Sequence, residues 1–100
     1  MEFKKWGHEF DGGYTSPDTL QEVAGVYVVL CSGAYVSTVV DVGEAENVKK
    51  ALLNHPRSSQ WKDNCYGTLY YAAHYTFSAS KRDREVIESL IREIAHPPCG

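Results

Sequence analysis

Residues 25–43 read GVYVVLCSGAYVSTVVDVG, and this stretch decides the fold of the chain. Val26–Leu30 is a run of β-branched, aromatic and other apolar side chains, which predicts a strand. Ser32-Gly33 supplies a turn, and Tyr35–Val42 is predicted to form a second strand. Two neighbouring strands with so short a connection pair antiparallel. The stretch therefore predicts a β-hairpin.

The spacing of apolar residues changes after Gly43 from that of a strand to that of a helix. One face of the predicted helix carries Val48, Ala51, Leu52 and His55. Pro56 follows directly and stops this helix. Residues 57–64 are mainly polar and predict a loop that holds Trp61.

Two further elements are predicted towards the C-terminus. Thr68–Thr76 is rich in aromatic residues and predicts a third strand. Ser78 or Ser80 is expected to cap a final helix, which ends before Pro97-Pro98. The apolar face of this helix is predicted to consist of Ile87, Leu90, Ile91 and Ile94.

The first 23 residues form an N-terminal arm with one predicted helical element. Gly12-Gly13 interrupts the arm, and its aromatic residues show no clear period, so most of it stays unassigned. Ser16 as an N-cap and Pro17 at the first helical position predict a short helix to about Val23.

The predicted elements make one α+β domain over residues 1–100, because a chain of 100 residues has no room for a second domain. Their order, ββαβα, predicts a three-stranded antiparallel sheet flanked by helices. The composition, 43% hydrophobic and 23% charged, is typical of a soluble globular protein. No apolar run reaches the roughly 18 residues of a membrane span, and residues 1–6 lack the apolar region of a secretory signal. We therefore expect a cytoplasmic protein without a membrane partner.

The three cysteines and four histidines lack the spacing of a structural zinc site. An odd number of cysteines in a chain expected to be cytoplasmic favours reduced thiols. Cys31 is predicted to be a core residue of its strand, and Cys99, next to the last residue, is predicted to be exposed.

Gly25-Val26-Tyr27, then Asp41-Val42-Gly43, a helix ending at His55 and Glu88 on the last helix together resemble the GIY-YIG nuclease superfamily. The resemblance runs from about Ala24 to the C-terminus. It implies the ββαβα core as the fold. It also implies a DNA endonuclease activity that uses Mg²⁺ or Mn²⁺ as its cofactor.

Four positions match the pattern of that superfamily. By resemblance, Tyr27 would lie near the attacking water, Gly43 would allow a close approach of the backbone, and Glu88 would hold the metal ion. His55 could donate to a phosphate or carry a proton. Each residue also has an ordinary structural interpretation: a strand aromatic, a turn glycine, a histidine that closes a helix, and a glutamate paired with Arg84 one turn away.

Three positions depart from the pattern. Asp41 stands where the second motif has a tyrosine, Ala51 stands where the first helix has an arginine, and His96-Pro97-Pro98 replaces an asparagine. Removing one preorganised donor costs on the order of 10²- to 10³-fold in rate in comparable sites, so the resemblance predicts weak or lost hydrolysis. Arg57, in the loop beyond the first helix, is the candidate substitute for the missing arginine, both in catalysis and in phosphate binding.

The charge pattern leaves two classes of function open. A net charge of −3 argues mildly against a duplex-DNA binder, although basic residues cluster near the first and last helices. We assign nucleic-acid binding to Gly43, Lys49, Lys50, Arg57, Lys62 and Arg84. The alternative is a non-catalytic module of the same fold that binds a protein or self-associates. Seven tyrosines and two tryptophans favour this alternative, because aromatic residues anchor protein interfaces.

Overall fold

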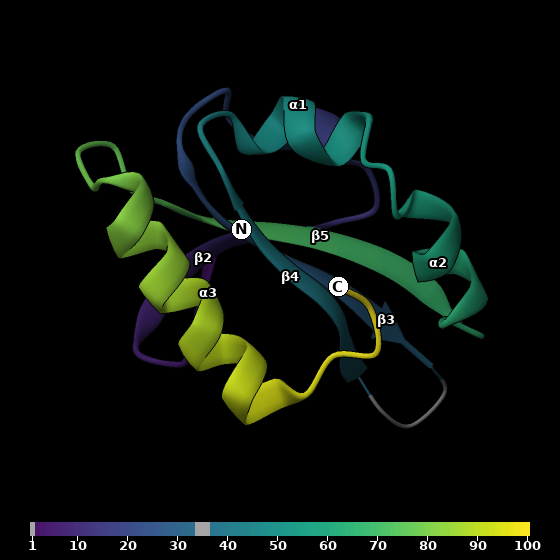
Figure 1. Cartoon of the computed structure of the whole chain (residues 1–100). Helices are drawn as coiled ribbons and strands as arrows, with labels where there is room; N and C mark the ends of the chain where they lie inside the picture. Colours follow the sequence, from purple (N-terminus) through teal and green to yellow (C-terminus); the bar gives the residue numbers. More distant parts are fainter. Residues whose placement is uncertain (1, 34–36) are drawn as a thin grey trace.

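A computed structural model describes residues 2–33 and 37–100 of the chain. Its five described strands form one antiparallel sheet in the order β1-β2-β5-β3-β4 (Figure 1). In chain order the elements are β1 (Glu2–Lys5), β2 (His8–Tyr14), the 3₁₀ turn η1 (Pro17–Thr19), β3 (Gly25–Ser32), β4 (Ser37–Ala45), α1 (Val48–Leu53), α2 (Ser58–Asp63), β5 (Thr68–Tyr75) and α3 (Lys81–Ala95).

The hairpin and the third strand that the sequence predicts are present at the centre of the sheet. β3 pairs antiparallel with β4 on one side and with β5 on the other, so Tyr27 lies opposite Gly43 and opposite Ala73. The predicted start of the second strand, at Tyr35, falls outside the described residues. The α+β class is therefore confirmed.

The prediction of a three-stranded sheet is wrong, because the N-terminal arm adds two more strands. β1 and β2 form a hairpin, and β2 pairs with β5 at the edge of the predicted sheet. Trp6 and Gly7 both have positive φ, which is the backbone of the tight hairpin turn that matches strand twist. Phe3 and Phe10 stack on the core side of this hairpin. The local signal for these strands was a pair of charged residues two positions apart in each, Glu2 with Lys4 and Glu9 with Asp11, because alternate residues of a strand face the same side.

The helices differ from their predicted extents for identifiable reasons. α1 ends at Leu53 and not at His55, because the residue before a proline avoids helical backbone. The predicted loop contains α2, which has no side-chain N-cap and a single buried residue, Trp61. η1 is capped by Ser16 as expected but spans only three residues. Ser80 caps α3 in a capping box with Asp83, which agrees with the predicted helix start.

The sheet has a hydrophobic cluster on each face. α1 and α2 cover one face through Val48, Leu52 and Trp61, and α3 packs on the other through Ile87 and Ile91 (Figure 1). The predicted apolar face of α3 is only half right: Leu90 and Ile94 are exposed, whereas Ile87 and Ile91 pack inward.

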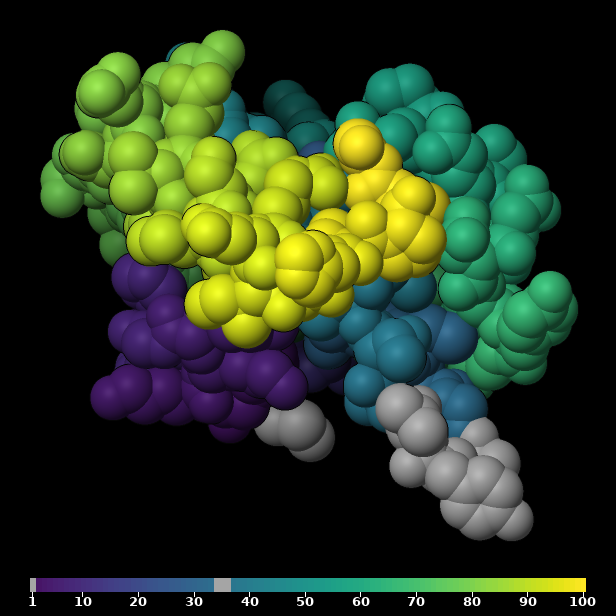
Figure 2. Space-filling view, turned by 60° about the horizontal axis from the view of Figure 1, so that its bottom comes forward, coloured from purple at the N-terminus to yellow at the C-terminus, as the bar shows by residue number. Residues whose placement is uncertain are grey.

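The predictions of reduced thiols and of an exposed Cys99 are wrong, whereas Cys31 lies in the core as predicted. Cys31 and Cys65 form a disulfide, which ties β3 to the chain just after α2. Cys99 is the described free thiol and is buried. The tail that carries it lies across β4 beside α2, with its backbone N–H donating to the carbonyl of Val40 (Figure 2). Sequence spacing gave no signal for this pairing, because 34 residues separate the two bonded cysteines.

Among the described residues, no helix is both long and apolar enough to cross a membrane.

Candidate functional site at the edge of strand β4

A fully buried carboxylate, Asp41, organises the candidate site. Its Oδ2 accepts hydrogen bonds from Arg57 Nε at 2.9 Å and from the indole N–H of Trp61 at 2.7 Å. Its Oδ1 accepts from Arg92 Nη2 at 2.8 Å and from the backbone N–H of Val42 at the same distance. Asp41 is 0% exposed. Four donors from β4, the α1–α2 connection, α2 and α3 therefore meet on one side chain.

The surroundings of Asp41 keep it ionised. Burial opposes the charged form, but the hydrogen bonds from Arg57, Trp61 and Arg92 outweigh it and hold the pKa of Asp41 below its usual value. Because the carboxylate is buried and surrounded by donors, it is unavailable to an incoming metal ion. Asp41 thus acts as the internal counter-ion of two arginines.

Tyr27 and His55 form the second part of the site. The Tyr27 hydroxyl and His55 Nε2 are 2.8 Å apart, and His55 Nδ1 accepts the backbone N–H of Arg57 at 3.0 Å. An Nδ1 that accepts carries no proton, so the neutral ring bears its proton on Nε2 and donates it to Tyr27. Burial and the charge of Arg57 lower the pKa of His55, which favours this neutral form. Burial, followed by the charge of Asp41, raises the pKa of Tyr27 to about 12, so the phenol stays protonated.

Gly43 is required by the position of the Tyr27 ring. A Cβ at residue 43 would lie 2.2 Å from the Tyr27 hydroxyl oxygen and 2.3 Å from Cζ. Such contacts are far inside van der Waals separation, so the ring and the side chain cannot coexist. The glycine of the second motif therefore makes room for the tyrosine of the first.

Gly43→Ala is expected to lower the free energy of unfolding by about 1 to 3 kcal/mol, because the new methyl group overpacks a buried site. Tyr27→Ala removes the ring that would clash, so adding Gly43→Ala to it should have little further effect. Urea denaturation of the wild type, both single variants and the double variant measures this coupling. Additive losses in the double variant would contradict the proposed steric relation.

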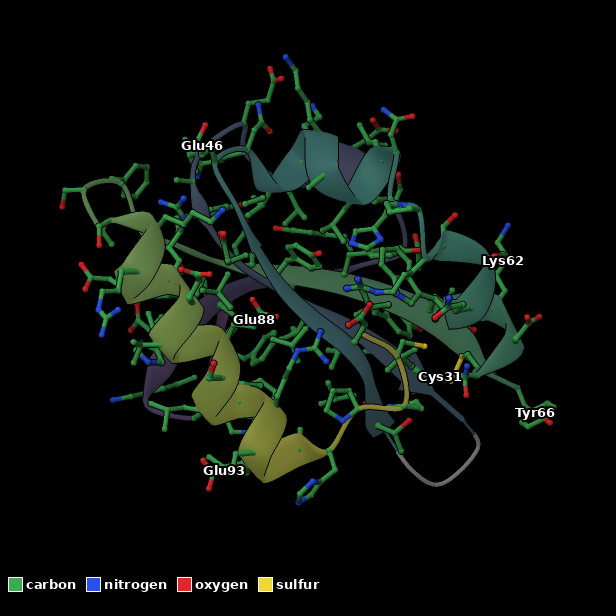
Figure 3. The ribbon with its side chains drawn as sticks, viewed as in Figure 1. Cys31, Glu46, Lys62, Tyr66, Glu88 and Glu93 are labelled. Atoms are coloured by element: carbon green, nitrogen blue, oxygen red, sulfur yellow. A yellow bond between two sulfur atoms is a disulfide. The ribbon has the colours of Figure 1, made fainter. Side chains whose placement is uncertain are left out.

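Arg92 joins α3 to the rest of the site. Its Nε donates to Glu88 Oε2 at 3.0 Å and its Nη1 to the carbonyl of Cys99 at 2.9 Å. Its Nη2 donates to Asp41 and also to the carbonyl of Val42. Glu88 points from α3 towards β4 (Figure 3). These contacts close the outer edge of β4 with α3 and the C-terminal tail.

The structure brings together five of the residues selected from the sequence. Tyr27 contacts both His55 and Gly43, Arg57 joins them through its backbone and through Asp41, and Glu88 joins through Arg92. The structural interpretation paired Glu88 with Arg84. In the structure Glu88 pairs instead with Arg92.

The other basic residues assigned to nucleic-acid binding lie outside this cluster. Arg84 is 4% exposed and pairs with Glu44, so we do not retain it as a nucleic-acid-binding residue. Lys50 and Lys62 are exposed and Lys49 is half-buried, on α1 and α2. Lys62 points away from the body of the protein (Figure 3).

Sequence reasoning missed Arg92 and Trp61 and misjudged Asp41. Arg92 had one local signal, its position four residues after Glu88, where a Glu-to-Arg pair supports a helix. The partners of Asp41 are 16, 20 and 51 residues away in the sequence. Asp41 therefore looked like a repulsive charge, although the fold neutralises it.

Within the described cluster, the guanidinium of Arg57 is the anion-binding group that reaches solvent. In the described part of the chain, the Arg57 side chain makes one hydrogen bond, through Nε, and is 30% exposed. Its terminal nitrogens can therefore bind two oxygens of a phosphate while Nε stays on Asp41. The charges of Arg57 and Arg92 balance those of Asp41 and Glu88, so the cluster itself carries no net charge.

A divalent metal ion fits this donor set poorly. Glu88 is the partly exposed carboxylate of the cluster, and its Oε2 already accepts from the Arg92 guanidinium. Asp41 is buried and has four donors. Among the described residues, no three His, Cys, Asp or Glu side chains are grouped to hold a metal.

No protein-family model, curated protein or solved structure matches the chain.

Proposed function

We propose that this chain is a GIY-YIG-like domain that associates with DNA through Arg57 and in which metal-dependent phosphodiester hydrolysis is weak or lost. The observation that carries the proposal is the convergence of Tyr27, Gly43, His55 and Arg57 on the face of the sheet that α1 and α2 cover. These residues come from β3, β4 and the connection between α1 and α2. Their proximity is the arrangement that the resemblance implies.

The topology of the core supports the same proposal. Apart from the additional helix α2 before β5, a β-hairpin, a helix, a strand beside the first hairpin strand and a long last helix follow one another in the order that the resemblance implies. The β1–β2 hairpin is an addition to the edge next to β5. It leaves the pairing of β3 with β4 and β5 intact.

Weak hydrolysis follows from the charges around the expected phosphate position. Ala51 packs against the core cluster and supplies no cation, and Arg57 shares its charge with Asp41. A Mg²⁺ or Mn²⁺ ion at Glu88 would lie beside the guanidinium of Arg92, which repels it. DNA binding requires neither a free Asp41 nor a metal ion, so it survives these departures.

Arg57→Gln is expected to weaken binding of a nicked or branched DNA by about 10- to 100-fold, because a charge-assisted hydrogen bond to phosphate contributes about 1.5 to 3 kcal/mol. The slope of log K against log salt should also fall by about 1. Fluorescence anisotropy with a labelled DNA at several salt concentrations measures both quantities.

Lys4→Gln is the matched control for this measurement, because Lys4 is an exposed cation on β1. β1 lies at the opposite edge of the sheet from β4, whose Asp41 binds Arg57. This substitution should change the affinity by less than about twofold. Circular dichroism checks that Arg57→Gln remains folded. Equal weakening by both substitutions, or no binding by the wild type at low salt, would refute the proposal.

A further inference from the structure

The outer face of α3 carries an apolar stripe that the domain itself does not cover. Val86, Leu90 and Ile94 are 51%, 53% and 63% exposed. They follow one another at intervals of four residues, so they lie along one side of the helix. Three large aliphatic residues in a row on a charged helix form a continuous apolar stripe, which is more than scattered surface apolar residues.

This stripe is separate from the side of α3 that faces the domain. Ile87 and Ile91 pack against the core cluster, and Arg84, Glu88 and Arg92 face β4. Glu93 points away from the sheet, in contrast to Glu88 (Figure 3). A partner can therefore cover the outer face without displacing any contact of the candidate site.

A shallow groove of about 400 Å³ accompanies the stripe. It is lined by Arg82, Glu85, Val86, Ser89, Leu90 and Glu93. Arg82, Val86, Ser89 and Glu93 are separated by four, three and four residues, which is the spacing of residues along the seam between two packed helices. The groove thus has the periodicity of a helix-packing surface.

We propose that a second copy of this chain occupies the groove, with the two α3 helices antiparallel across a twofold axis. Arg82 and Glu93 lie at opposite ends of the groove on the same helical face. An antiparallel arrangement places Arg82 of each copy opposite Glu93 of the other, which gives two ion pairs. A parallel arrangement would oppose like charges at both ends. The charges therefore select an antiparallel second copy as the occupant.

The same axis also fits the sizes of the side chains. An axis that pairs residue 82 with residue 93 pairs Val86 with Ser89, because both pairs have the same midpoint. The small Ser89 side chains let the helix axes approach closely at the crossing. Val86 of each copy then packs beside Ser89 and Leu90 of the other, and these side chains are removed from water.

The dimer should be weak and concentration-dependent. α3 has 15 residues and is therefore about 22 Å long. A contact along one such helix buries less than the roughly 800 Å² per partner of a standard interface. We expect a dissociation constant in the micromolar range or weaker. This association concerns the face of α3 away from Arg57, so it is independent of DNA binding.

Sedimentation velocity of the full chain, from micromolar to millimolar concentration, tests the proposal. The wild type should shift from monomer to dimer, and Leu90→Asp should raise the dissociation constant by at least about tenfold, as expected of a central interface residue. Leu53→Asp is the control, because Leu53 is 44% exposed on α1. A monomeric wild type throughout the range, or equal effects of both substitutions, would overturn the proposal.

Charge reversal tests the antiparallel arrangement. Arg82→Glu and Glu93→Arg should each weaken the dimer, and the double variant should return close to the wild-type dissociation constant. Neither change opposes helix formation, because acidic residues near the start and basic residues near the end suit the helix dipole. A double variant as weak as the singles would exclude the antiparallel pairing.

Discussion

Asp41→Asn is expected to lower the free energy of unfolding by about 3 kcal/mol. Removing one partner of a buried ion pair leaves uncompensated charge, which costs about 3 to 5 kcal/mol. We expect the lower end, because the side chains of Arg57 and Arg92 are 30% and 26% exposed and retain some water. For a domain of this size the melting temperature should fall by about 10 to 20 °C. Urea and thermal denaturation measure the two quantities.

The loss of stability caused by Asp41→Asn should become smaller as the pH is lowered. The pKa of Asp41 is lowered in the folded state, so its ionised form stabilises the fold above the unfolded value of about 3.9. This contribution is lost as the pH falls through the lower folded value. The stability difference between wild type and variant should therefore be full near neutral pH and shrink under acid conditions.

Asp63→Asn is the control for Asp41→Asn, because it removes the same charge from an exposed position at the end of α2. Substitutions of this kind usually change stability by less than about 0.5 kcal/mol. A loss at Asp41 no larger than the loss at Asp63 would contradict the role of Asp41 as the centre of the site.

Reduction of the Cys31–Cys65 disulfide is expected to lower the free energy of unfolding by about 3 to 4 kcal/mol. The two cysteines are 34 residues apart, and the chain-entropy model gives roughly this value for a loop of that length. The bond also fastens the end of α2, whose Trp61 donates to Asp41. Urea denaturation of the wild type with and without a reductant measures the effect.

Cys31→Ala combined with Cys65→Ala should reproduce the loss and abolish the response to reductant. Cys99→Ala leaves the disulfide in place, so the reductant should still destabilise that variant by the same amount. Thiol titration of the denatured protein before reduction should detect one reactive cysteine. Three reactive cysteines in the purified protein, or no response to reductant, would contradict the disulfide.

The disulfide also bears on where the protein acts. Such bonds persist mainly in oxidising compartments. The expectation of a cytoplasmic location rested on the N-terminal residues and on the lack of a membrane span, and the reduced thiols expected from that location are contradicted by the disulfide. The location remains a prediction.

Local signals were sufficient for the centre of the fold. The β-branched run of β3, the aromatic run of β5 and the Ser80 cap of α3 each specify an element through neighbouring residues. The same holds for Tyr27 and Gly43, which the motifs placed on adjacent strands and which the register brings opposite each other. Short-range chemistry decides these features, so the sequence alone was enough to predict them.

The candidate site required the tertiary structure. Asp41 reads as an isolated negative charge in the sequence, yet Arg57, Trp61 and Arg92 bring donors to it from three other parts of the chain. No local pattern encodes those meetings, since they depend on how α2, α3 and the tail pack around the edge of β4.

The sequence by itself determined the α+β class, the central hairpin and the capped last helix, because hydrophobic period, turn residues and caps act over a few residues. Only the tertiary structure decided that the N-terminal arm adds two strands, that Cys31 bonds Cys65, and which side of α3 is left uncovered. Each of these depends on which distant segment supplies the partner. Pairing, bonding and burial are relations between residues far apart in the chain, and packing of the whole domain selects among them.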